Sequence, residues 1–387
     1  MKFVVLGAGL QGVATAYDLL RNPATEAVTL ADVDAERVEA AAGRLVSEKV
    51  KAVEADCSAP EGLKKAMRDH QVAVSALPFR LNLEAARAAT ECGVSYVDMG
   101  GNIETVLDEL RLNQAAKDAG VTLIPDCGLA PGLGNVLAAD AVAEMEEVND
   151  VRIRVGGLPA VPQPPWNYML VFSFEGLLNE YTGKCAVLRD WNRTEVDALT
   201  GLEIITFPKP LGPCEAAFTS GGSSTLPWSF AGRVRNLDYK TVRYPGHYEK
   251  LKALEALGFF DDREVEVEGV RVKPWKVLRV LFEDKLSFPH ATDLVILRVE
   301  SLGLKDGKPV RLRHEMMASR DEGTGLTAMM RTTAFPTSII AQMIAGGHIE
   351  RRGAYPPEMV VPPRELIAEL AKRDILVTRI WEDIDGK

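Results

Sequence analysis

The sequence predicts two kinds of organisation, an α/β doubly wound parallel sheet in its N-terminal part and an α+β arrangement after it. The apolar run FVVL at residues 3–6 leads directly into the glycine-rich segment GAGLQG. Short apolar runs then alternate with helix-like stretches as far as residue 128. From residue 150 onward apolar and charged residues alternate instead, the pattern of half-exposed strands. These observations favour an N-terminal Rossmann domain followed by a second, α+β domain.

The first strand and the first helix frame a dinucleotide-binding loop. Gly7 permits a tight turn, Gly9 lets the backbone approach a pyrophosphate, and Gly12 allows the helix to pack closely on the strand. Leu10 and Gln11 complete the loop. The helix expected to begin here adds free N–H groups and the positive end of its dipole. We therefore predict cofactor contacts along the whole segment.

An acidic residue ends the second predicted strand, AVTLAD at residues 27–32. The carboxylate of Asp32 can accept hydrogen bonds from both ribose hydroxyls of NAD and would repel the 2′-phosphate of NADP. Asp32 or Asp34 could instead cap the next helix. Arg37 is the one feature that would help to bind a 2′-phosphate. The pattern therefore favours NAD, with NADP as the weaker alternative.

The next two predicted strands add candidate cofactor contacts. The third, within KVKAVEAD at 49–56, ends at Asp56, which either lies near the adenine or caps the following helix. The fourth, VAVSALP at 72–78, should run under the nicotinamide side of the site where it ends. Its exit consists of Ser75, Ala76, Leu77 and Pro78.

The fifth and sixth predicted strands, SYVDMGG at 95–101 and VTLIPDCG at 121–128, carry polar residues at their ends. Helices expected around 83–92 and 107–119 precede them. Ligands of doubly wound sheets bind at the carboxyl ends of the strands, so Asp98, Asp126 and Cys127 are expected to line the site.

The second half contains a long antiparallel hairpin at residues 293–318, turning at Asp306-Gly307. A largely apolar helical stretch at 323–347 is expected to return and pack against the nucleotide domain. The predicted domains are therefore interleaved. Residues 1–127 plus about 325–350 form the Rossmann domain, and residues 128–324 plus about 351–387 form the second, a substrate and dimerisation domain.

Candidate substrate contacts gather in TVRYPGHYEKLKALEALGFF, residues 241–260. Arg243 can hold a carboxylate through two parallel hydrogen bonds, and Tyr244 and His247 can supply hydrogen bonds or a proton path. The Pro-Gly turn would present all three at a helix start. From residue type alone, a solvated arginine and a surface histidine are favoured. Ser220, in the loop FTSGGSST, could contact an amino-acid head group or belong to a plain turn.

Composition narrows the classes of function. The chain has 387 residues, 26% of them charged and 47% hydrophobic, as in an ordinary soluble protein of two domains. A net charge of −10 argues against nucleic acid or an anionic membrane as partner. No apolar run is long enough to span a membrane, and the first residues are better interpreted as a strand and helix than as a signal peptide. Five cysteines without metal-site spacing argue against a zinc site and fit reduced thiols in the cytoplasm.

Five segments together resemble the saccharopine dehydrogenase family, specifically its L-lysine 6-dehydrogenase branch. They are GAGLQG, PDCGLAPGLGN at 125–135, VGGLP at 155–159, SFEGLLNEYTG at 173–183 and RYPGHYEKLKALEALGFF at 243–260. The resemblance spans residues 1 to about 347, and the last two segments are the more specific ones. It implies a homodimeric NAD(P)-dependent enzyme that oxidises amines or reduces imines.

One residue departs from the saccharopine-forming pattern. Saccharopine reductases have GLDPG where this chain has GLAPG, so Ala130 stands in place of a carboxylate. The lysine 6-dehydrogenase branch has alanine there. The resemblance therefore implies oxidative deamination of the ε-amine of lysine to the 6-semialdehyde, which cyclises to piperideine carboxylate. A reductase of saccharopine or carboxy-polyamine type, and a catalytically silent dinucleotide-binding protein, stay open as alternatives.

The implied chemistry assigns roles to the candidate residues. An ammonium, with a reference pKa of about 10.4, cannot give up hydride until it has lost a proton. Asp98 and Asp126 are the candidate catalytic carboxylates, and one of them could instead be structural. Arg243 would hold the α-carboxylate of the substrate. Cys127 could lie beside the nicotinamide, although a role as a small buried hydrophobic residue is favoured.

Overall fold

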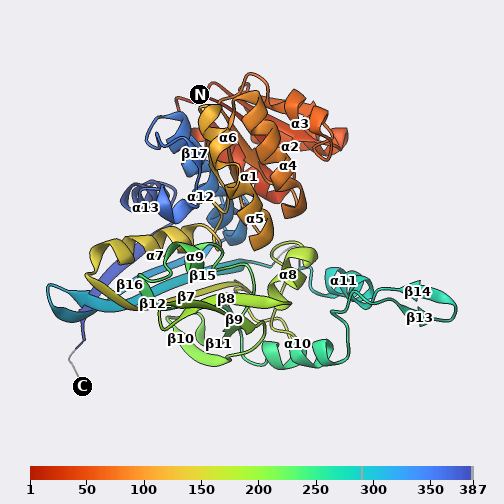
Figure 1. Ribbon diagram of the computed structural model, residues 1–387. Helices are drawn as coiled ribbons and strands as arrows, with labels where there is room; N and C mark the ends of the chain where they lie inside the picture. Colours follow the sequence, from red (N-terminus) through yellow and green to blue (C-terminus); the bar gives the residue numbers. More distant parts are fainter. Residues whose placement is uncertain (289–290, 385–387) are drawn as a thin grey trace. The chain divides into compact units, whose positions relative to one another are not determined.

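The computed structural model describes residues 1–288 and 291–384, and its contacts divide the chain into two compact units (Figure 1). Unit 1 comprises Met1–Met145, Ser224–Phe230 and Met330–Val377. Unit 2 comprises Glu146–Ser223, Ala231–Met329 and the segment from Thr378 onward. Residues 128–145 and 351–377, which the sequence analysis assigned to the second domain, thus lie in the unit that contains the nucleotide-binding loop.

Unit 1 is built on a seven-stranded parallel sheet with the order β17-β6-β5-β4-β1-β2-β3. Its strands are β1 (Lys2–Leu6), β2 (Ala27–Asp32), β3 (Val50–Glu54), β4 (Val72–Ser75), β5 (Ser95–Asp98), β6 (Thr122–Ile124) and β17 (Gly353–Ala354). The strand order reverses between β1 and β4, as in doubly wound sheets that bind ligands at this point. The predicted Rossmann arrangement is confirmed. The two-residue β17 was not predicted, since so short a strand has no periodicity.

The helices of unit 1 follow the predicted alternation with strands, with one difference. They are α1 (Leu10–Arg21), α2 (Ala35–Leu45), α3 (Pro60–Met67), α4 (Asn82–Cys92), α5 (Ile103–Leu110), α6 (Asn113–Asp118), α7 (Leu133–Glu144), α9 (Leu226–Ser229), α12 (Ala328–Ala345) and α13 (Pro363–Ala371), with the 3₁₀ helices η1 (Phe79–Leu81) and η2 (Pro357–Met359). The single helix predicted at 107–119 is two helices, α5 and α6. The N–H groups of Arg111 and Leu112 bond three residues back, to Asp108 and Glu109, which tightens the last turn and ends α5.

The core of unit 1 lies along the sheet. Four of the five residues of β1 are buried, and Val4 and Leu6 belong to a cluster that includes Tyr96 of β5. Alanines on α4, among them Ala85 and Ala89, complete this cluster and let the helix pack closely. No helix in the described part of the chain is long and apolar enough to cross a membrane.

Unit 2 contains a nine-stranded mixed sheet in which β12 and β7 run parallel and the long hairpin β15–β16 is antiparallel. Its strands are β7 (Glu147–Pro159), β8 (Lys184–Arg189), β9 (Asn192–Asp197), β10 (Glu203–Phe207), β11 (Gly212–Phe218), β12 (Val234–Arg243), β15 (Asp293–Lys305), β16 (Lys308–Ser319) and β18 (Val377–Asp383). The predicted hairpin turn is confirmed, since Asp306 and Gly307 both have positive φ. An α+β unit follows the Rossmann sheet, as the sequence predicts.

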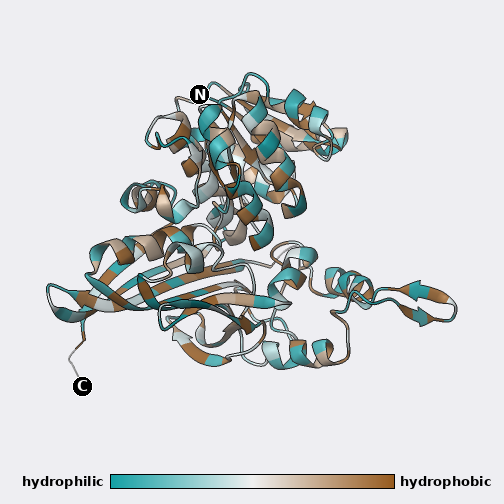
Figure 2. Ribbon diagram, viewed as in Figure 1, coloured by the Kyte–Doolittle hydropathy of each residue, from teal (hydrophilic) through white to brown (hydrophobic). Residues whose placement is uncertain are grey.

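Three helices and a small hairpin complete unit 2. They are α8 (Phe174–Tyr181), α10 (His247–Ala256), α11 (Pro274–Lys285) and the pair β13 (Val265–Val267) and β14 (Val270–Val272). Figure 2 shows hydrophobic and hydrophilic residues alternating along this hairpin. Aromatic residues of α8, α10 and α11 pack together in a second core, which includes Tyr168 and Tyr181.

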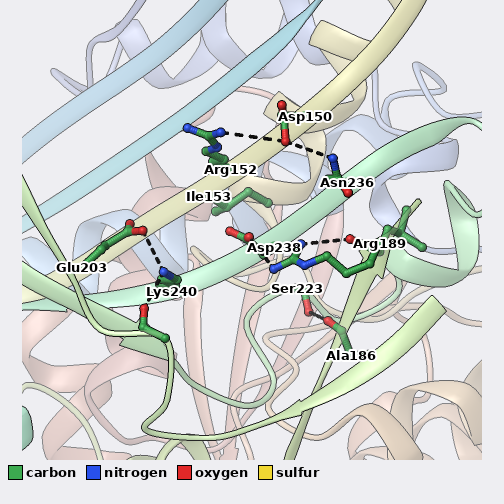
Figure 3. Close-up of polar contacts among 12 residues, drawn as sticks. Asp150, Arg152, Ile153, Ala186, Arg189, Glu203, Ser223, Asn236, Asp238 and Lys240 are labelled. Atoms are coloured by element: carbon green, nitrogen blue, oxygen red, sulfur yellow. Dashed lines mark hydrogen bonds and ion pairs between the residues drawn. The ribbon is translucent and has the colours of Figure 1, made fainter. Parts of the chain in front are cut away.

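One strand of unit 2 is more buried than its alternating pattern predicts. Arg154 of β7 is only 4% exposed, and its guanidinium donates to the carboxylates of Glu203 and Asp238. The network continues in Figure 3, where Lys240 donates to Glu203 at 2.7 Å and Arg189 donates to Asp238 at 2.9 Å. A buried charge requires such partners. The expectation that β7 is half-exposed is therefore wrong at Arg154.

Candidate functional site

The glycine loop between β1 and α1 leaves room for a dinucleotide phosphate. Gly7 has φ +97°, and a Cβ there would lie 2.8 Å from the carbonyl oxygen of Ala76, at the exit of β4. A Cβ on Gly12 would lie 1.8 Å from the carbonyl oxygen of Gly7. A Cβ on Gly9 would meet no atom within 4 Å. Two glycines are thus required by the fold, and the third borders open space at the start of α1, as a phosphate site needs.

A pocket of about 410 Å³ opens beside this loop. Its lining includes Gly9, Leu10 and Val13 from the loop and α1, and Arg37 and Arg44 from α2. Arg37 lies 3.7 Å from Asp32 at the end of β2, where the ribose of a dinucleotide binds in this fold. The residues present therefore fit a nicotinamide dinucleotide.

Asp32 and Asp34 have separate roles. Asp32 accepts hydrogen bonds from the N–H of Ala8 at 2.8 Å and from the N–H of Asp34 at 3.1 Å, and it lies 3.7 Å from Arg37. Asp34 caps α2 by accepting from the N–H of Arg37. The cap predicted as an alternative for either residue thus belongs to Asp34. Asp32 holds the glycine loop and faces Arg37.

The other predicted cofactor residues lie at strand exits. Asp56 accepts from the N–H and hydroxyl of Ser58, and the N-cap of α3 is Ala59, so Asp56 is not the helix cap. At the end of β4, the Ser75 hydroxyl donates to Asn82, and the Ala76 N–H donates to Leu6. Leu77 and Pro78 continue from there into η1, for which Pro78 is the N-cap.

Asp98 and Asp126 meet at the ends of β5 and β6. Oδ1 of Asp98 accepts from the N–H of Gly100 at 2.7 Å and from the N–H of Asp126 at 3.0 Å. The side chain of Asp126 accepts from the hydroxyl of Ser224 and lies against Gly100, where a Cβ would be 1.8 Å from its Oδ1. Both carboxyl groups are fully buried. The two candidates are therefore neighbours, and backbone N–H groups interact with both: those of Gly100 and Asp126 with Asp98, and that of Gly101 with Asp126.

Two acidic residues that the sequence analysis did not single out also belong to this region or support it. Glu109 of α5 is 1% exposed, and its side chain lies next to that of Asp98. Glu358 accepts from the hydroxyls of Thr225 and Ser229. These two hydrogen bonds to Glu358 hold the segment Ser224–Phe230 in place, and Ser224 in turn donates to Asp126. The helical spacing from the apolar Val106 to Glu109 was a signal for its burial, whereas nothing local marks Glu358.

Burial governs the protonation of these acids. It raises the pKa of Asp126 well above its usual range, helped by the charge of Asp98. It raises the pKa of Glu109 in the same way, again helped by Asp98. The pKa of Asp98 is also raised by burial, but hydrogen bonds to the carboxylate oppose that rise. Within residues 1–288 and 291–384, no lysine or arginine forms an ion pair with any of the three.

Cys127 lies beside the acids without a charge of its own. Its thiol is fully buried, and its N–H donates to the carbonyl of Asp98 at 2.7 Å. Burial and the neighbouring carboxyl groups raise the pKa of the Cys127 thiol well above its usual range. It is thus a neutral thiol, as a small packing residue would be.

In unit 2, Arg243 and His247 lie in one buried network. Arg243 is 2% exposed, donates from Nε to the Tyr181 hydroxyl at 2.8 Å, and places Nη2 3.5 Å from Glu180. The Tyr181 hydroxyl is 3.0 Å from Nε2 of His247, and Arg243 also stacks on Tyr168. The favoured expectation of a solvated arginine and a surface histidine is therefore wrong, because aromatic side chains enclose both.

The remaining substrate candidates of unit 2 lie apart from that network or at its edge. Tyr244 donates its hydroxyl to the carbonyl of Pro159 and packs in a different apolar cluster. Ser220 donates its N–H to the carbonyl of Glu180 and its hydroxyl to the carbonyl of Asn179. Burial raises the pKa of Glu180 to about 7, while the charge of Arg243 acts to lower it. Ser220 therefore fixes the backbone next to the carboxyl group that faces Arg243.

Comparison with family models covers nearly the whole described chain. Residues 3–124 match the saccharopine dehydrogenase NADP binding domain, and residues 128–376 match the saccharopine dehydrogenase C-terminal domain. The chain belongs to the saccharopine dehydrogenase family. This confirms the resemblance seen in the sequence motifs, and it identifies unit 1 as carrying a dinucleotide-binding domain.

Individual relatives of this family are distant. Saccharopine dehydrogenase [NADP(+), L-glutamate-forming] of Pyricularia oryzae is 25% identical over 54% of this chain and 47% of its own length. The Schizosaccharomyces pombe enzyme of the same name is 22% identical over 86% of this chain and 88% of its own length. Mouse mitochondrial alpha-aminoadipic semialdehyde synthase is 22% identical over 76% of this chain but 39% of its own length. The match thus spans less than half of two of these three relatives.

Solved structures show the same fold. Apo saccharopine dehydrogenase (L-Glu forming) from Saccharomyces cerevisiae has a TM-score of 0.79 at 19% identity, over 98% of this chain and 99% of that one. Homospermidine synthase from Legionella pneumophila, in complex with NAD, has a TM-score of 0.67 at 14% identity, over 100% of this chain and 92% of that one. At such identities the likeness establishes the fold.

Proposed function

We propose that the protein is an NAD-dependent dehydrogenase that oxidises the ε-amine of lysine. The product is the 6-semialdehyde, which cyclises to piperideine carboxylate. Membership of the saccharopine dehydrogenase family supports chemistry at a carbon–nitrogen bond of an amino acid. Ala130, where saccharopine reductases carry a carboxylate, supports free lysine over saccharopine.

One observation carries the proposal. Asp98, Asp126 and Glu109 form a buried acidic cluster at the ends of β5 and β6, and no ion pair to them is found among the described residues. Buried carboxylates are normally paired with a cation. A substrate ammonium supplies that charge, whereas an alcohol substrate would not.

Asp98 is the residue we assign as base. Two backbone N–H groups favour its ionised form, while burial and the nearby Asp98 charge raise the pKa of Asp126 and so favour its protonated form. Asp98 can therefore accept the proton that the substrate ammonium must lose. NAD, when bound, takes hydride from the carbon that bears the amine. Water then adds to the resulting imine and releases ammonia and the aldehyde.

The cofactor we propose is NAD. Asp32 ends β2 with a carboxylate that repels a 2′-phosphate. The family model is described as NADP binding, and Arg37 and Arg44 line the adjacent pocket, so NADP is the competing cofactor. The charge of Asp32, held 3.7 Å from Arg37, offsets the nearer of those two guanidinium groups.

Arg243 is the residue we propose for the α-carboxylate of lysine. Its Nη2 makes no hydrogen bond within the described chain, and its nearest carboxylate, Glu180, is 3.5 Å away. A substrate carboxylate would give this buried donor a partner. His247, whose pKa burial lowers well below its usual range, stays neutral and keeps Tyr181 in place as a hydrogen-bond partner.

The second candidate function is a saccharopine-type or carboxy-polyamine-type reductase. The activities for which the relatives above are named, and the likeness to the homospermidine synthase fold, favour it. A catalytically silent dinucleotide-binding protein is the third. We also propose a homodimer, and the cytoplasm as compartment because all five cysteines are unpaired thiols.

A spectrophotometric assay separates the three functions. Purified protein is incubated with NAD and lysine, and with NADPH and aldehyde–amine pairs, while the near-ultraviolet absorbance of the reduced nicotinamide is followed. Lysine-dependent formation of NADH supports the first, and consumption of NADPH supports the second. Dinucleotide binding without turnover supports the third. Asp98→Asn should abolish turnover of lysine, whereas Asp126→Asn should reduce it less, because burial raises the pKa of Asp126 and favours its uncharged form.

A further inference from the structure

Glu109 is a buried acidic residue to which the proposed reaction assigns no role. It lies in the last turn of α5, is 1% exposed, and neither carboxyl oxygen receives an N–H donor from the described residues. An ionised carboxylate without donors is costly to bury. Its carboxyl group therefore has to be protonated, and the proton needs an acceptor.

The acceptor is Asp98. Oδ1 of Asp98 already takes two backbone N–H groups, and Oδ2 receives neither a backbone N–H nor a cation within the described chain. The side chains of Asp98 and Glu109 are within hydrogen-bond contact. The Tyr96 hydroxyl also lies within hydrogen-bond contact of both carboxyl groups, but it carries a single proton and donates to the carbonyl oxygen of Asn82 at 3.3 Å. A hydrogen bond between two carboxyl groups needs a proton on one of them, because an ionised carboxylate can only accept.

The donors decide which of the two is ionised. Asp98 is stabilised as an anion by the N–H groups of Gly100 and Asp126, and Glu109 has no such support. Burial and the adjacent charge of Asp98 raise the pKa of Glu109 well above its usual range. Glu109 is thus the acid of the pair and Asp98 its base.

We infer that Glu109 is a positioning residue whose protonated carboxyl donates a hydrogen bond to Asp98 and keeps that carboxylate ionised and oriented for the substrate ammonium. The inference rests on the proposed function. When the ammonium binds, its N–H bond breaks with the electron pair left on nitrogen, and an O–H bond forms on Asp98. A bound oxidised nicotinamide would accept hydride from the carbon of the neutral amine, and Asp98 would return its proton to water after the aldehyde has left. Glu109 keeps its own proton throughout.

Infrared spectroscopy of the resting protein tests the hydrogen bond without turnover. The difference spectrum between wild type and Glu109→Gln should contain the carbonyl band of a protonated carboxylic acid, shifted in D₂O. Glu104→Gln is the matched control, since Glu104 lies exposed on the same helix. A difference spectrum without that band at neutral pH overturns the inference.

The pH profile of kcat/KM tests the consequence for Asp98. Glu109→Gln retains an N–H donor to Asp98, so its acid limb should stay close to that of wild type. Glu109→Leu removes the donor, so the acid limb should move to higher pH by about one unit. Circular dichroism confirms that each variant is folded. An acid limb that stays in place in folded Glu109→Leu contradicts the inference, whereas the infrared band in a protein that oxidises no amine contradicts the proposed function alone.

Discussion

At the scale of single residues, the charge of Asp32 is the feature on which cofactor choice depends. Asp32→Asn keeps an oxygen to accept from the N–H of Ala8 but removes the charge that repels a 2′-phosphate. The ratio of kcat/KM for NAD to that for NADP should fall roughly tenfold or more, the change that about 1.4 kcal/mol produces. Steady-state kinetics with both cofactors measures it.

Asp34→Asn is the matched control for that substitution. Asparagine caps a helix about as well as aspartate, so α2 should keep its cap and the cofactor ratio should stay near wild type. If both variants changed the ratio equally, general electrostatics and not the position of Asp32 would be responsible.

Arg243 gives a second prediction at this scale. Arg243→Lys keeps the charge but cannot both donate to Tyr181 and present a second N–H at the position of Nη2. The KM for lysine should rise about tenfold or more, the equivalent of about 1.4 kcal/mol, and the KM for NAD should change little. Initial-rate kinetics with each substrate varied separates the two.

Arg235→Lys, on the same strand but exposed and paired with Asp190, is the control. An unchanged KM for lysine in Arg243→Lys would remove Arg243 from the substrate site. An equal rise in both KM values would assign it a purely structural role.

Prediction from sequence succeeded for residues whose position follows from their element. Asp98 and Asp126 end neighbouring parallel strands, so they were expected at one edge of the sheet, and they are in contact there. Burial of Arg243 was not expected, because arginine as a residue type is usually solvated. The aromatic side chains that enclose it, including Tyr168 and Tyr181, come from other segments of the chain.

At the scale of elements, the turn from β1 to α1 offers a test that separates folding from binding. A Cβ on Gly9 meets no atom within 4 Å, whereas a Cβ on Gly12 would lie 1.8 Å from the carbonyl oxygen of Gly7. Gly9→Ala should fold like wild type but lose dinucleotide affinity at least tenfold, about 1.4 kcal/mol, since its methyl occupies phosphate space. Gly12→Ala should lose about 1–3 kcal/mol of stability through overpacking.

Thermal unfolding and calorimetric titration with NAD give the two readouts for each variant. Gly9→Ala that binds NAD normally would show that the pyrophosphate does not approach this glycine. Gly12→Ala with an unchanged melting temperature would show that α1 can move away from β1 at no cost.

Elements with a clear period were predicted well, and those without one were not. Six of the seven strands of the Rossmann sheet and the long hairpin β15–β16 follow from apolar runs, alternation and turn residues. The break between α5 and α6 and the edge strand β17 do not follow from any such local pattern. The segment Ser224–Phe230 lies in unit 1 because Glu358 binds its hydroxyl groups, a contact over more than a hundred residues that no local pattern encodes.

At the scale of the whole molecule, the buried acids should make stability depend on pH. The pKa of Glu109 is raised in the folded chain, so the folded state keeps a proton that the unfolded state releases above its ordinary value of 4.5. The folded state binds more protons in that window, and stability therefore falls as pH rises toward the folded pKa. One such proton contributes a slope of about 1.4 kcal/mol per pH unit.

Denaturant unfolding at a series of pH values checks this for wild type and Glu109→Gln. The glutamine variant lacks the titrating group, so its stability should decline less steeply above pH 4.5. Taking the difference between the two curves cancels groups common to both, such as His247. Parallel curves would mean that Glu109 titrates alike in both states, and Glu104→Gln should parallel wild type.

The sequence by itself determined the parallel Rossmann sheet, its glycine loop, the acidic end of β2 and the family. Each depends on local rules, namely apolar periodicity, the conformational freedom of glycine and the geometry of strand ends. Only the tertiary structure decided which acids meet and how they are protonated. Asp98, Glu109 and Asp126 meet one another, and Ser224 and Glu358 support them from distant segments. Their charges depend on burial and on donors from those segments, and burial of this kind exists only once the chain has folded.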